Sequence, residues 1–159
     1  MGKILVLAPE KCTSCRTCEL ACSFSHEQEF NPIRSRVSVL SFEKEGISVP
    51  IMCLQCDNAA CVAVCPVGAI TRNDATGAMV INQITCIKCK MCINACPFGS
   101  TAYDDISRSI IKCDLCNGNP ECAQNCPSGA ITFKDSNTAN MTKKKLIASK
   151  FRDIFAGGN

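Results

Sequence analysis

The apolar residues of this chain fall in short runs separated by polar and cysteine-rich segments. Residues 3–7 read Lys-Ile-Leu-Val-Leu and predict an edge strand. Valine and isoleucine alternate with polar neighbours in residues 37–39 and 47–49, which predicts a hairpin within an insertion at 23–52. Two further apolar runs flank a turn-rich stretch within residues 69–81 and predict another hairpin. The pattern therefore indicates a mixed α+β chain built from short antiparallel hairpins, short helices and loops.

The composition changes after Ile131. The polar stretch from Lys134 to Asn140 is predicted to be a linker, and Thr142 is predicted to cap a helix that runs to about Phe155. This helix would be amphipathic, with a basic face. Its apolar face would carry Ile147, Phe151, Ile154 and Phe155. The pattern leaves open whether the helix packs on its own body or on a partner subunit.

The apolar material is thin for an ordinary core, because aromatic residues make up 5% of the chain and tryptophan is absent. At 159 residues the chain forms one domain or two small fused ones. The first residues do not resemble an export signal, and no stretch approaches the roughly 18 apolar residues of a membrane span. We therefore expect a cytoplasmic protein, since reduced thiols survive in that compartment.

Sixteen cysteines fall into four groups of four, with none left over. The groups are Cys12, Cys15, Cys18 and Cys22; Cys53, Cys56, Cys61 and Cys65; Cys86, Cys89, Cys92 and Cys96; and Cys113, Cys116, Cys122 and Cys126. The first and third groups follow the C-x2-C-x2-C-x3-C run of bacterial ferredoxins, and the other two have a longer second gap. Four quartets of thiolates predict four [4Fe-4S] clusters.

The second and fourth groups belong to an internal repeat, because residues 53–71 return as residues 113–132 and both copies end in Cys-Pro-x-Gly-Ala-Ile-Thr. The third group ends similarly, and the first has Ser23 where the others have proline. Such a repeat indicates duplication of a two-cluster unit. The glycines at 68, 99 and 129 are expected to relieve the backbone as it leaves each cluster.

Bound clusters would change the charge of the chain. The formal charge is +3, but sixteen thiolates and four oxidised cluster cores would bring the assembled protein to roughly −5. Binding to nucleic acid is therefore not expected. Arg16, Lys88 and Lys90 lie inside the first and third loops, where they serve either to stabilise reduced clusters or simply as soluble surface.

Three other classes fit the residues less well. Structural zinc sites join two C-x2-C pairs across a longer spacer, whereas three ligands crowd each loop here. Catalysis by this chain alone is not expected, because His26 is its single histidine, more typical of a surface or packing role, and Asp104-Asp105 is read as a turn or solvated face. A redox sensor would not need four clusters. A free-standing polyferredoxin stays open as an alternative.

On these motifs the chain resembles the four-cluster, ferredoxin-type electron-transfer subunits of molybdenum and tungsten oxidoreductases. The resemblance covers residues 12–132. Within the family it is most similar to the small iron–sulfur subunit of bacterial tungsten-dependent aldehyde oxidoreductases. The resemblance implies a duplicated two-cluster ferredoxin fold over residues 1–133, followed by a linker and basic helix over 134–159.

The resemblance also implies that ligands cross between groups. The implied sets are Cys12, Cys15, Cys18 and Cys126; Cys113, Cys116, Cys122 and Cys22; Cys53, Cys56, Cys61 and Cys96; and Cys86, Cys89, Cys92 and Cys65. The clusters would then form one row, with the second- and third-group clusters as one pair and the first- and fourth-group clusters as the other.

The expected role is relay of single electrons from a large tungsten or molybdenum pterin subunit, oxidising an aldehyde, to a flavin subunit that reduces NAD or to a ferredoxin. A formate dehydrogenase or hydrogenase complex is the alternative setting. A row with a cluster near each end is also compatible with head-to-tail self-association, with the basic tail as the contact.

Overall fold

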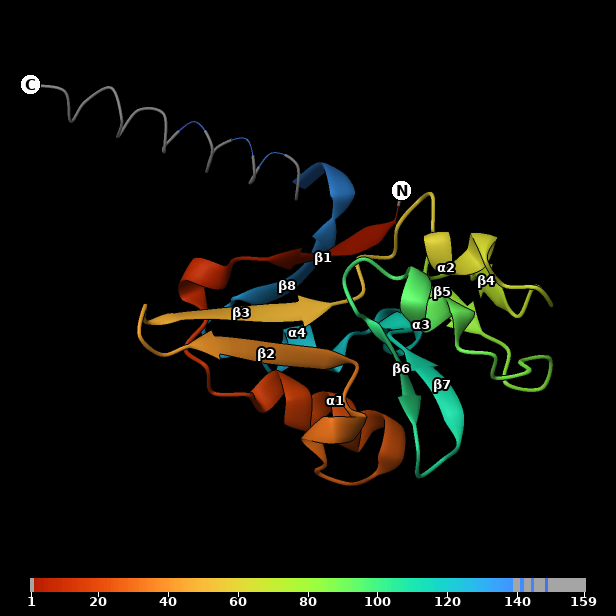
Figure 1. Ribbon diagram of the computed structural model, residues 1–159. Helices are drawn as coiled ribbons and strands as arrows, with labels where there is room; N and C mark the ends of the chain where they lie inside the picture. The colour runs from red at the N-terminus through yellow and green to blue at the C-terminus, as the bar shows by residue number, and fades with distance from the viewer. Residues whose placement is uncertain (1, 139–140, 142–143, 145–147, 149–159) are drawn as a thin grey trace, which may run out of the picture.

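The computed structural model describes residues 2–138, 141, 144 and 148. Its strands pair into four separate two-stranded antiparallel sheets, with short helices between them (Figure 1). The strands are β1 Lys3–Leu7, β2 Val37–Phe42, β3 Ile47–Met52, β4 Ile70–Arg72, β5 Met79–Ile81, β6 Thr101–Asp104, β7 Ser109–Lys112 and β8 Ile131–Asp135. The α-helices are α1 Thr17–Glu27, α2 Ala60–Ala63, α3 Met91–Ala95 and α4 Glu121–Gln124, and the 3-10 turns are η1 Pro9–Lys11, η2 Pro32–Arg34 and η3 Leu115–Gly118.

The two ends of the described chain meet in one sheet. Strand β1 pairs with β8, from Lys3 opposite Asp135 to Leu7 opposite Ile131, and Figure 1 shows the two lying side by side. The strand predicted at residues 3–7 is confirmed. Strand β8 includes Lys134 and Asp135, which were expected in a linker, because the pairing with β1 extends that far.

The insertion forms the predicted hairpin of β2 and β3, in register from Val37 opposite Met52 to Phe42 opposite Ile47. Val37 and Val39 turn inward and are almost fully buried. On the outer side of this hairpin, the side chain of Glu19 in α1 accepts a hydrogen bond from the Val39 N–H at 2.6 Å. The hairpin is therefore tied to the helix that carries the first cysteine group.

Helix α1 is longer than the short turns expected near the cysteines, and it runs past position 23, where the insertion was expected to begin. The physical reason is the residue that follows Cys22. Proline ends a helix because it lacks an N–H and restricts the preceding residue, and the first group has Ser23 instead. Ser23 is fully buried and donates its hydroxyl to the Leu20 carbonyl at 3.1 Å.

The other three groups share one turn after their last cysteine. In each, the N–H of the glycine three residues on donates to the cysteine carbonyl at 3.2 to 3.3 Å. Those glycines have φ between +60° and +67°, a conformation that other residues adopt at a cost. They are Gly68, Gly99 and Gly129. The predicted role of these glycines is confirmed, and the repeat extends to the backbone.

The middle of the chain holds two hairpins. The β4–β5 hairpin was predicted, whereas β6–β7 was not. Asp104-Asp105 was expected to form a turn or a solvated face: Asp105 lies in an exposed turn, whereas Asp104 ends β6 and is buried. Its carboxylate accepts hydrogen bonds from Nη2 of Arg34 at 2.8 Å and Nε at 3.1 Å, although 70 residues separate the two in sequence. This ion pair ties the insertion to the middle of the chain.

The apolar core is divided into three small clusters, and each contains cysteines. Val37, Val39, Met52 and Ile131 surround cysteines of the first and fourth groups. Ala59, Ile70, Met79 and Ile110 surround cysteines of the second and third groups. The third cluster joins Cys53 and Cys113. The core is therefore arranged around the cysteines instead of one continuous apolar layer.

The predicted helix from Thr142 to about Phe155 lies largely outside the described residues. Among the residues that the model describes, no helix has the length and apolar character needed to cross a membrane.

Candidate metal-binding cysteine sites

The first and third cysteine loops share one unusual backbone conformation. The residues on either side of the middle cysteine have φ between 56° and 65° although none is glycine. These residues are Ser14 and Arg16 in the first loop, and Lys88 and Lys90 in the third. Left-handed residues of this kind are rare and gather at functional sites. The middle cysteines, Cys15 and Cys89, are the two exposed ones of the sixteen.

The second and third groups come together around two small apolar cavities. One is lined by Cys53, Cys56 and Cys61 of the second group with Cys96 of the third. The other is lined by Cys86, Cys89 and Cys92 of the third group with Cys65 of the second. Each cavity thus receives three sulfurs from one loop and the last cysteine of the other loop.

The first and fourth groups share one buried core. Cys18, Cys22 and Cys122 are buried together, and Cys126 packs against them. Burial raises the pKa of Cys18 to about 12, and the charge of Cys126 adds to the effect. Burial also raises the pKa of Cys122, and the charge of Cys22 adds to this rise. The last cysteine of each group therefore lies near the buried thiols of the other group.

Buried thiols with raised pKa values suit a metal site. A thiolate in an apolar environment is unfavourable by itself, and a bound cation reverses this preference by neutralising the charge. All sixteen cysteines are free of disulfides. Soft thiolate donors in groups of four are the donor set of iron–sulfur clusters. The residues present therefore fit [4Fe-4S] clusters.

The last cysteine of every group accepts a hydrogen bond from a backbone N–H. The donors are Ala69 to Cys65 at 3.3 Å, Ser100 to Cys96 at 3.4 Å, Ile131 to Cys126 at 3.4 Å and Arg36 to Cys22 at 3.3 Å. In three groups the donor follows the cysteine by four or five residues, just after the shared Pro-x-Gly turn. The first group lacks that turn, so Cys22 receives its N–H from the insertion instead. Such N–H groups favour the charged thiolate.

His26 connects the first and fourth groups, and its role is structural, in line with the packing role and not the surface role of the two that were expected. Its Nδ1 donates to the Cys22 carbonyl at 2.8 Å and its Nε2 to Oδ1 of Asp114 at 3.0 Å. Both ring nitrogens donate only in the charged imidazolium. Hydrogen bonding to Asp114, and next to Cys22, raises the pKa of His26 to about 10. The sequence offered no signal for this pair, which is 88 residues apart.

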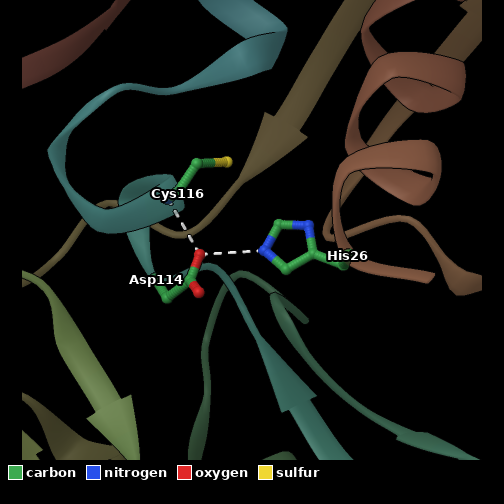
Figure 2. A group of neighbouring side chains, drawn as sticks. All are labelled: His26, Asp114 and Cys116. Atoms are coloured by element: carbon green, nitrogen blue, oxygen red, sulfur yellow. Dashed lines mark hydrogen bonds and ion pairs between the residues drawn. The ribbon is translucent and has the colours of Figure 1, made fainter. Parts of the chain in front are cut away.

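Figure 2 shows what this pair holds in place. Oδ1 of Asp114 also accepts the backbone N–H of Cys116 at 2.9 Å, so the dashed line runs to the backbone of that cysteine and not to its sulfur. His26, Asp114 and Cys116 are close enough to suggest an ion site. However, the imidazolium has no free lone pair to offer a metal. We therefore interpret these hydrogen bonds as structural contacts that hold the fourth cysteine loop against α1.

Comparison with known proteins identifies related iron–sulfur proteins. Residues 45–136 match a family model described as a 4Fe-4S dicluster domain, and residues 9–25 match a 4Fe-4S binding domain. The polyferredoxin-like subunit of aliphatic sulfonate oxidoreductase from Pyrococcus furiosus is 35% identical over 151 residues, which cover 95% of this chain and 81% of that protein. Formate hydrogenlyase subunit 2 from Escherichia coli is 32% identical, over 91% of this chain and 88% of that protein.

A solved structure of the active site complex BamBC of benzoyl coenzyme A reductase, as isolated, aligns with 98% of this chain and 95% of that one, at 26% identity and a TM-score of 0.49. That structural likeness is too low to add to the argument. The sequence matches alone span most of the chain and contain all four cysteine groups. The chain therefore belongs to the 4Fe-4S dicluster domain family, as an iron–sulfur electron-transfer protein of the kind found in oxidoreductase complexes.

Proposed function

We propose that the chain relays single electrons through four [4Fe-4S] clusters whose ligands cross between cysteine groups. The ligand sets are those implied by the resemblance: the first three cysteines of each group, with Cys126, Cys22, Cys96 and Cys65 crossing from the paired group. The observation that carries the proposal is the pair of apolar cavities, each lined by three cysteines of one group and the last cysteine of another. When bound, each cluster supplies a centre that gains and loses one electron.

The residues around the cysteines would bind and shield these centres. Backbone N–H groups point at the crossing thiolates, and buried aliphatic side chains such as Ile70 and Ile131 exclude water. Cys53 and Cys113 share one buried core, which supports a row in which the second- and fourth-group clusters are neighbours. The exposed Cys15 and Cys89 then belong to the two outer clusters, where electrons would enter and leave.

For the partners, we propose a tungsten or molybdenum pterin subunit that oxidises an aldehyde on one side, and a flavin subunit reducing NAD or a ferredoxin on the other, in the cytoplasm. Support comes from the family resemblance and from a relative that is itself a subunit of an oxidoreductase. A second setting, a formate dehydrogenase or hydrogenase complex, is favoured by the similarity to formate hydrogenlyase subunit 2. A free polyferredoxin remains the alternative to a fixed complex. Head-to-tail self-association through the basic tail is a separate proposal about contacts between copies of the chain.

Anaerobic purification from the native host with metal analysis tests the function. We expect about sixteen irons per chain, and tungsten or molybdenum on a large co-purifying subunit. Iron without a partner would favour a free polyferredoxin, and zinc in place of iron would overturn the proposal. Light scattering of the full chain and of a 1–140 form tests self-association, which equal monomeric masses would exclude.

Single cysteine variants test the crossing of ligands. Cys96→Ser and Cys53→Ser should perturb the same cluster signal in electron paramagnetic resonance spectra, because both residues line one cavity. Cys92→Ser serves as the matched control, since it shares a group with Cys96 but lines the other cavity. If Cys96→Ser and Cys92→Ser perturb the same signal instead, the ligands do not cross.

A further inference from the structure

Lys112, the last residue of β7, has a buried side chain with an exposed fraction of 8%. Its Nζ lies 3.0 Å from Sγ of Cys53, 3.0 Å from the Met79 carbonyl and 3.3 Å from Oε1 of Gln55. A fourth contact, to the Cys113 carbonyl, is longer at 3.5 Å. An ammonium group has three donors, so the three shorter contacts satisfy it. Lysine is seldom buried unless it is paired.

As a cluster ligand, the Cys53 sulfur would be a thiolate and so the anionic partner of this lysine. Among the described residues, no ion pair joins Lys112 to a carboxylate, and its other three acceptors are neutral oxygens. A neutral hydrogen-bond donor would be enough to hold those oxygens together, so they do not explain why a charged ammonium is buried at this position. A thiolate at 3.0 Å provides one, because a charge-assisted hydrogen bond is roughly twice as strong as a neutral one.

Lys112 lies against cysteines of two groups. It lines the cavity that contains Cys53, Cys56 and Cys61 of the second group. Its Nζ also lies 3.5 Å from the carbonyl of Cys113, the first cysteine of the fourth group. The lysine therefore lies where the two halves of the proposed row meet.

Gln55 completes this junction. Its Nε2 donates to the Cys113 carbonyl at 2.9 Å, while its Oε1 accepts from Nζ of Lys112 and, at 2.7 Å, from the Met79 N–H. The glutamine thus holds the fourth-group backbone and the ammonium in fixed relation to Cys53. Gln55 belongs to the second cysteine loop, whereas Lys112 and Cys113 lie 57 and 58 residues later in the sequence. The junction is therefore a contact between two distant segments.

The internal repeat provides a built-in comparison. Lys112 directly precedes Cys113, and the equivalent residue before Cys53 is Met52, which is also buried, with an exposed fraction of 2%. The same position in the repeated motif therefore accepts an apolar side chain of similar length. Only the second copy of the motif carries a positive charge at this position. Its Lys112 places a cation beside the cavity that contains Cys53, whereas Met52 places no charge at the equivalent position of the first copy.

We propose that Lys112 raises the reduction potential of the cluster held by Cys53 and so favours electron transfer onto that cluster, which lies at the junction between the two halves. This inference rests on the proposed function. Adding an electron to a cluster adds negative charge, and a buried cation stabilises that charge strongly in a low-dielectric interior. Loss of the cation disfavours the reduced state of this cluster relative to the other three.

Anaerobic redox titration of the full-length iron-loaded chain, followed by electron paramagnetic resonance, tests this role. In Lys112→Met we expect one cluster signal to move to lower potential, so that its ratio of reduced to oxidised form at a fixed potential falls roughly tenfold, as for loss of a hydrogen bond to a charged group. Lys112→Arg should keep the native value. Lys44→Met, which removes an exposed lysine at the insertion hairpin, should move no signal.

Three results would overturn the inference. The first is an unchanged set of potentials in Lys112→Met with its iron content intact. The second is a native potential in Lys112→Gln, which keeps a hydrogen-bond donor without the charge. The third is loss of that cluster in both neutral variants, which would assign the lysine a structural role only. Failure of the unaltered chain to bind about sixteen irons would instead refute the proposed function itself.

Discussion

Shielding of the clusters by aliphatic side chains can be tested at Ile131. This residue is 1% exposed and packs among Cys18, Cys22 and Cys122. Ile131→Ala removes three carbon atoms, which corresponds to about 2.4 kcal/mol at roughly 0.8 kcal/mol for each buried methylene. The cavity left behind raises the cost towards the range of about 2 to 5 kcal/mol measured for such truncations. A loss of 2.4 kcal/mol shifts the opening equilibrium of this core by roughly 50-fold.

Release of iron to an excess of a coloured chelator, under anaerobic conditions and mild guanidinium, measures this opening. When reclosing is faster than capture, the rate of release follows the equilibrium population of the open state. We therefore expect the clusters of the first and fourth groups to lose iron about 50-fold faster in Ile131→Ala, by the same conversion. The equivalent residue of the other half is Ile70, 3% exposed. Ile70→Ala should accelerate loss from the second- and third-group clusters instead.

Ile84 provides the matched control, because its exposed fraction is 96%. Ile84→Ala makes the same chemical change without removing buried contacts, so iron release should stay at the native rate. Equal rates in Ile131→Ala and Ile84→Ala would refute the reasoning, since they would mean that buried aliphatic packing does not limit access to the clusters.

Three further outcomes are expected. Gly99→Ala should destabilise the chain by about 1 to 2 kcal/mol in denaturant titration, because its φ of +60° strains an L residue although the space is open, whereas Gly2→Ala should have no effect. Burial alone would raise the pKa of Asp104, but hydrogen bonds from Ser107 and Arg34 lower it to about 2. Its stabilising effect is therefore complete above the ordinary value of 3.8 and is lost as the pH falls towards 2. Asp104→Asn should lower the denaturation midpoint at pH 7, by a difference that shrinks between pH 4 and pH 2. Removal of iron by a chelator should abolish the far-ultraviolet circular dichroism of the folded chain, since the core is arranged around the cysteines.

Most of the structural features that the sequence predicted correctly depend on local sequence patterns. Spacing of the cysteines indicated the four loops, and Cys-Pro-x-Gly indicated a turn that the structure repeats three times. Strand β1 and the hairpins β2–β3 and β4–β5 followed from alternation and turn residues within a few positions. These features depend on neighbours in sequence, so a single sequence contains the information needed.

Contacts between distant segments could not be predicted in the same way. Arg34 with Asp104 and His26 with Asp114 join residues 70 and 88 positions apart, and nothing in the local sequence of either partner specifies the other. The β6–β7 hairpin was not predicted, although Asp104-Asp105 was read as a turn or solvated face. In the structure Asp104 is the last residue of β6 and is paired with Ser109 of β7. Its carboxylate also accepts the N–H of Ile106, so Asp104 begins the turn that joins the two strands.

The pairing of β1 with β8 imposes an order on how the molecule can be made. A ribosome releases residues 3–7 long before residues 131–135 exist, so β1 must wait for nearly all of the described chain before it finds its partner. The middle segment, with the β4–β5 and β6–β7 hairpins, has no such delay, because both strands of each hairpin emerge together. During synthesis the first cysteine loop is therefore made before the other three loops and is among the last to be enclosed, because its core includes Cys122 and Ile131. Its thiols stay outside a finished core until translation reaches β8.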